Sequence, residues 1–95
     1  MHEKAVMDDL VREIVSMARA EGAHRVTRVC VRLGVLSHFT PEHFREHFED
    51  ATRGTLAEGA AVEAEAATDP SEPGAQGVLL ESVELDVGRE SRAAQ

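Results

Sequence analysis

The hydrophobic pattern of the first 36 residues changes its period once, and this change constrains the fold more than any other feature. Between Lys4 and Ala20, apolar residues recur at the spacing of one helix face: Met7, Leu10, Val11, Ile14, Met17 and Ala18. Gly22 follows as a natural helix end. From Arg25 to Leu36 the apolar residues alternate instead: Val29, Val31, Leu33 and Val35. The pattern predicts an amphipathic helix and then a long strand with one wet face.

A second helix is predicted to begin after Thr40. Thr40 is a good N-cap residue, Pro41 fits the first helical position, and Glu42 favours the positive end of the helix. Phe44 and Phe48 follow at i and i+4, so both are expected to point into the core.

Two histidines share another face of this second helix. His43 and His47 are four residues apart, a spacing that suits one metal ion. The segment lacks the Glu directly after the first His that a zinc-peptidase motif requires, and it offers two ligands unless Glu42 or Glu46 joins them. We therefore interpret the pair as part of a solvated helix face, with a metal or catalytic role as the alternative.

The second half of the chain has weaker patterns. Residues 53–59 contain two glycines and are interpreted as a connection, whereas residues 60–66 alternate as a modest strand. Residues 68–77 have a loop composition, and residues 78–87 return to strand-like alternation. The tail at 88–95 has no pattern and is expected to be disordered.

Composition excludes several classes of partner. A net charge of -8 argues against binding to nucleic acid or an anionic membrane, because phosphate binding needs clustered Lys and Arg. The sequence has no apolar run that could span a bilayer, and its start is unlike a signal peptide, so we expect a cytoplasmic protein. The single cysteine, Cys30, rules out an internal disulfide and a multi-cysteine zinc site within the chain. We interpret it as a small residue on the sheet face.

The first three residues, Met1, His2 and Glu3, form a candidate metal chelate. The terminal amine of Met1, the amide nitrogen of His2 and imidazole Nδ1 can close small fused rings around one ion, and Glu3 can complete the set. Nitrogen-rich ligands in a plane suit Ni(II) or Cu(II), whereas Zn(II) prefers a tetrahedron. Metal binding is expected to strengthen as pH rises, because these groups must lose protons.

The chain as a whole resembles the nickel domain of the HypA-type metallochaperones, which help to insert nickel into nickel–iron (NiFe) hydrogenase. The resemblance rests on an ordered set of motifs: MHE at the start, GA-x-RVT at 22–27, LG-x-LS at 33–37, PE-x-F at 41–44, FE at 48–49 and GT-x-AEGA at 54–60. It implies an α/β (α+β) domain over residues 1–87, with two helices packed on one face of a small three-stranded mixed sheet.

The resemblance also implies a function. His2 would be the essential nickel ligand, assisted by the Met1 amine, nearby backbone nitrogens and Glu3. The chain would be a hydrogenase maturation factor rather than an enzyme, and its partners would be the hydrogenase large subunit and a nickel-handling maturation GTPase. The alternative is a divergent HypA-like interaction module that docks the maturation partners without delivering nickel.

One part of the family pattern is missing. Family members carry a zinc lobe between the last two strands, held by two pairs of cysteines, where this sequence has TDPSEPGAQG at 68–77. We therefore expect no structural zinc. We expect this short segment to close a hairpin between adjacent strands at small entropic cost.

Overall fold

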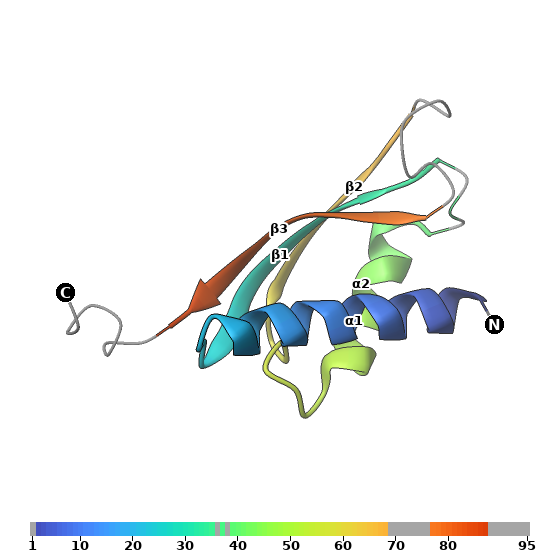
Figure 1. Cartoon of the computed structure of the whole chain (residues 1–95). Coiled ribbons are helices and arrows are strands. Elements are labelled where there is room, and N and C mark those ends of the chain that lie inside the picture. The colour runs from blue at the N-terminus through green and yellow to red at the C-terminus, as the bar shows by residue number, and fades with distance from the viewer. Residues whose placement is uncertain (1, 36, 38, 69–76, 88–95) are drawn as a thin grey trace.

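The computed structural model describes residues 2–35, 37, 39–68 and 77–87. The elements follow one another in this order: α1 (His2–Ala20), β1 (Arg25–Leu33), α2 (Pro41–Thr52), β2 (Ala61–Ala66) and β3 (Val78–Asp86) (Figure 1). Each predicted helix and strand is present, but α1 begins two residues earlier and β1 ends three residues earlier than predicted. The predicted tail and most of the predicted loop before β3 lie outside the described residues.

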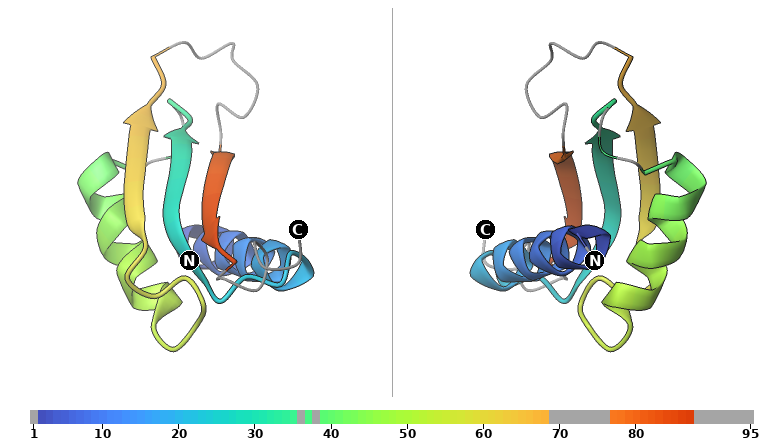
Figure 2. Two further views of the ribbon diagram at one scale, coloured as in Figure 1. Left: turned by 90° about the vertical axis from the view of Figure 1, so that its left-hand side faces the viewer. Right: turned by 90° about the vertical axis from the view of Figure 1, so that its right-hand side faces the viewer.

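The strands form one mixed sheet in the order β2-β1-β3 (Figure 2). β1 is parallel to β2 and antiparallel to β3, so that Val29 lies between Val62 and Val83. Parallel strands need a long crossover, and α2 provides it between β1 and β2. The expected hairpin between the last two strands is therefore wrong. β2 and β3 flank β1, so residues 67–77 join strands about 10 Å apart, which is two strand spacings.

Both helices pack on one face of the sheet, as predicted, and α2 runs alongside β2 (Figure 2). The core brings together buried side chains of α1, β1 and α2: Met7, Leu10, Val11, Ile14, Ala18, Val26, Val29, Val31, Leu33, Phe44 and Phe48. The predicted anchors Phe44 and Phe48 are 0% and 1% exposed. The helical and the alternating apolar stripes thus face each other across a single core.

Two residues assigned to apolar faces from the sequence are not buried. Met17 is 42% exposed, because at 100° per residue it lies roughly 75° from the centre of the buried stripe of α1. Val35 is also 42% exposed, because β1 ends at Leu33 rather than continuing to residue 36. The chain turns there, and the Ser37 N–H donates a hydrogen bond of 3.0 Å to the Gly34 carbonyl.

The start of α2 is fixed by two contacts. The Thr40 hydroxyl accepts a hydrogen bond of 3.1 Å from the His43 N–H, which confirms the predicted N-cap. Phe39, directly before the cap, is buried edge-on against Phe44, with ring centroids 5.6 Å apart. This is a hydrophobic staple, and its spacing in the sequence would have identified Phe39. The two contacts hold the histidine-bearing face of α2 in one position.

The connection from α2 to β2 is ordered and joins the core. Gly54 and Gly59 take positive φ values of 80° and 81°, which glycine adopts without steric cost. The Val26 N–H donates a hydrogen bond of 2.8 Å to the Leu56 carbonyl, and Ala57 is fully buried. The predicted connection at 53–59 is therefore confirmed. It also ties the end of α2 to β1.

Candidate metal centre

The predicted chelating residues do not precede the first helix. α1 begins at His2, two residues earlier than expected, so His2 and Glu3 lie in its first turn. Met1 lies outside the described residues. The first amides of a helix have no carbonyl one turn back to bond, so the His2 and Glu3 nitrogens are not used within α1. A backbone nitrogen can therefore bind a metal here without breaking a helical hydrogen bond.

The first turns of α1 lie beside the middle of α2. A cavity of about 250 Å³ separates the two helices at this point, and its walls come from Lys4, Met7, Asp8, His47, Asp50 and Ala51. Lys4 forms an exposed ion pair of 3.1 Å with Asp8 one turn later. The topology thus brings His47 next to the first turns of α1, although about 40 residues separate the two in the chain.

The two histidines of α2 converge. The Nε2 atoms of His43 and His47 are 2.8 Å apart, and their ring centroids are 4.4 Å apart. Both rings are half-buried and contact Phe39, at 6.0 Å from His43 and 6.4 Å from His47 between ring centroids. The pair is half-buried rather than fully solvated, and the described residues place no third metal-ligating side chain beside it. The staple residue Phe39 covers one side of the pair.

The described part of the chain holds no group of three or more His, Cys, Asp or Glu side chains arranged around one metal position. Any metal bound by the His43–His47 pair must take its other ligands from water or from groups outside that part. The predicted N-terminal chelate likewise depends on a group outside the described residues, the amine of Met1.

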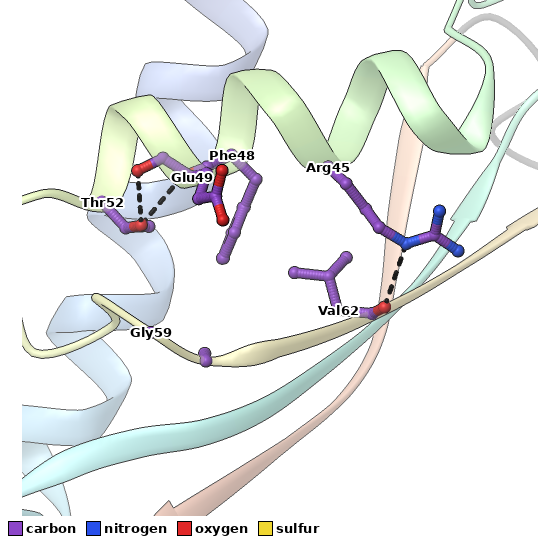
Figure 3. Close-up of a pocket in the computed structure, with 7 residues that line it drawn as sticks. Arg45, Phe48, Glu49, Thr52, Gly59 and Val62 are labelled. Atoms are coloured by element: carbon purple, nitrogen blue, oxygen red, sulfur yellow. Dashed lines mark hydrogen bonds between the residues drawn. The ribbon is translucent and has the colours of Figure 1, made fainter.

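A second cavity, of about 150 Å³, lies between α2 and β2 (Figure 3). Two of its polar side chains bond to backbone carbonyls of the fold. The Arg45 side chain donates a hydrogen bond of 3.4 Å to the Val62 carbonyl at one end. At the other end the Thr52 hydroxyl donates to the Phe48 carbonyl at 2.8 Å. We assign this cavity to the packing of α2 on β2.

The outer face of the sheet is a layer of paired charges. Arg28 of β1 forms an ion pair with Glu63 of β2 and lies 3.9 Å from Glu84 of β3. Cys30 lies on the central strand β1, and its sulfur is 3.7 Å from a carboxylate oxygen of the same Glu63. Cys30 is half-buried, as expected for a small residue on this face. Arg28 of the central strand thus lies between carboxylates of both edge strands.

None of the helices among the described residues is both long enough and apolar enough to cross a lipid bilayer.

Two solved structures share this fold. The solution structure of the Ni metallochaperone HypA from Helicobacter pylori superposes with a TM-score of 0.73 at 17% identity, and covers 90% of this chain and 98% of that one. A second solution structure, of HypA protein, gives a TM-score of 0.72 at 20% identity, with 93% and 98% covered. At identities of 17% and 20%, the structural similarity establishes a shared fold.

Sequence comparison identifies the family. The family model for hydrogenase/urease nickel incorporation, metallochaperone, hypA matches residues 1–70. Hydrogenase maturation factor HypA of Chlorobium limicola is 42% identical over 65 residues, which are 68% of this chain and 56% of that protein. HypA of Acidithiobacillus ferrooxidans is 38% identical over 63 residues, 66% of this chain and 56% of that protein. The chain belongs to the HypA family. Its matched segment spans little more than half the length of these curated relatives.

Proposed function

We propose that this chain captures Ni(II) with Met1, His2 and Glu3 and delivers the ion to an apo-metalloenzyme, without catalysing a reaction itself. The observation that carries the proposal is the family match, which covers residues 1–70 and so includes the N-terminal chelate. The description of the family names nickel incorporation for hydrogenase or urease, and this supports nickel as the cargo. We assign the nickel-binding unit to residues 1–87, which include all the helices and strands described.

The position of the chelate at the start of α1 has a small electrostatic cost that metal coordination outweighs. A cation at the positive end of a helix is disfavoured by about 0.3–1 kcal/mol. Metal sites with several protein ligands gain on the order of 10 kcal/mol, which is far larger than this cost. A deprotonated amide and the Glu3 carboxylate would also neutralise the charge of the ion. The end of a helix is held on one side, so the ion stays open to transfer.

The proposed recipient is the large subunit of a NiFe hydrogenase, and the proposed helper is a nickel-handling maturation GTPase. The family description and the names of the relatives, which are hydrogenase maturation factors, support this choice. The net charge of -8 favours cations over nucleic acid and anionic lipid as binding partners.

The test is a Ni(II) titration of the untagged protein with its native start, followed by visible absorption and calorimetry. We expect one tightly bound equivalent with the absorption of planar nickel, and its loss in His2→Ala. His24→Ala is the matched control, because it removes an exposed histidine at the far end of α1 and should bind nickel normally. Binding that is weak and equal in His2→Ala and the unaltered protein would contradict the proposal.

A further inference from the structure

The His43–His47 pair has a geometry that the proposed function does not use. The two Nε2 atoms are 2.8 Å apart, so in the metal-free protein one ring donates a hydrogen bond to the other. If each ring instead holds its proton on Nδ1, both Nε2 atoms are free of protons, and a small rotation of the rings would let them bind one ion. Both rings are half-buried beside the core residue Phe39, and His47 lines the cavity between α1 and α2.

The separation of the nitrogens is an ordinary hydrogen-bond distance and is also compatible with chelation of one ion. Two nitrogens each about 2.0 Å from a metal at a right angle lie about 2.8 Å apart, whereas a tetrahedral angle requires about 3.3 Å. The observed 2.8 Å therefore fits two neighbouring corners of a planar or octahedral ion. Ni(II) and Cu(II) prefer such geometry with nitrogen ligands.

The surroundings of the pair favour a cation. Phe39 is buried against both rings and excludes water from one side, which strengthens electrostatic interactions there. α2 carries four acidic residues and one arginine, so the local charge attracts a divalent ion. Asp8 and Asp50 line the cavity beside His47, where they pair with Lys4 and Arg53 at the surface.

We propose that His43 and His47 form a second metal site, a two-nitrogen chelate for a divalent ion such as Ni(II) or Cu(II), on the face of α2 next to the first turns of α1. This site is independent of the proposed N-terminal chelate, because its ligands come from α2 alone. Water fills the remaining positions of the ion. With two protein ligands the site is weaker than a chelate of three or four.

The experiment removes the N-terminal chelate and then tests the pair. In a His2→Ala background, Cu(II) and Ni(II) are titrated against a competing chromophoric chelator, with His43→Gln, His47→Gln and His24→Gln added singly. We expect one residual equivalent in His2→Ala alone. Its affinity should fall at least about tenfold with either His43→Gln or His47→Gln, because the second imidazole binds at a high effective concentration. His24→Gln should leave it unchanged.

A second measurement on the His2→Ala protein avoids any effect of substitutions in α2 on folding. Imidazole nitrogen resonances are followed during the metal titration, and His43 and His47 should be perturbed together and before His24. The proposal is overturned if the residual equivalent survives His43→Gln or if the two rings respond separately. Failure of the N-terminal chelate would appear instead as an unaltered titration in His2→Ala, so the two proposals fail independently.

Discussion

Ile14 and Met17 belong to the same apolar pattern of α1, yet the structure places them in different environments. Ile14 is fully buried, whereas Met17 is 42% exposed at the edge of the helix face. Periodicity identifies which face of the helix is apolar, but the width of the buried stripe depends on how far the sheet and α2 extend over it. The same limit explains Phe39, whose packing on two histidines depends on the fold around α2.

We expect the free energy of unfolding to distinguish these two positions. Ile14→Ala should lose about 2–5 kcal/mol, because it removes buried methyl groups and leaves a cavity. Met17→Ala should stay within about 0.5 kcal/mol, as is usual for exposed sites. Urea unfolding followed by circular dichroism measures both. Equal losses in the two variants would show that the face of α1 is covered differently in solution.

At the scale of elements, local chemistry predicted the start of α2 and the end of α1 well, but not the end of β1. The cap at Thr40 and the proline at Pro41 fixed the beginning of α2 from the sequence alone. The end of β1 could not be predicted in this way. The Gly34 N–H still donates a hydrogen bond of 2.8 Å to the Gly77 carbonyl, one position beyond the last β1–β3 pair, and the chain then turns at Gly34–Ser37.

The N-cap of α2 gives a test at this scale. Thr40→Ala removes the acceptor for the His43 N–H and should destabilise the protein by about 1 kcal/mol. Thr40→Ser keeps a hydroxyl at the same place and should restore most of that loss. The midpoint temperatures of thermal unfolding of the unaltered protein, Thr40→Ala and Thr40→Ser test this expectation. A Thr40→Ala variant as stable as the original would mean that the Phe39 staple alone fixes the start of the helix.

For the whole molecule, the predicted two helices on one face of a three-stranded mixed sheet agree with the structure. The neighbours of each strand were not predictable, because alternation shows which side chains face the core and not which strands pair. The candidate site divides in the same way. His2 and Glu3 stay a prediction from the sequence. The sequence also singled out the i, i+4 histidines, but only the fold shows that their rings are in contact and that His47 lies near the first turns of α1.

β3 lies beyond residue 70, where the family match ends, yet it completes the sheet. A chain ending at Thr68 should therefore lose its cooperative thermal transition, because β1 would lack its antiparallel partner and the core would lose the cover of that strand. A chain ending at Val87 is the control and should unfold at the same temperature as the full chain. A sharp transition in the shorter chain would show that residues 1–68 fold alone.

The strand order also affects the protein during its synthesis. β1 leaves the ribosome before either of its neighbours, and β3 begins 45 residues after β1 ends (Leu33 to Val78). At roughly 5–20 residues per second, the nascent chain carries an apolar strand with at least one open edge for several seconds. Arg28 and Arg32, which pair with carboxylates in the finished sheet, act during this interval as charged gatekeepers against aggregation.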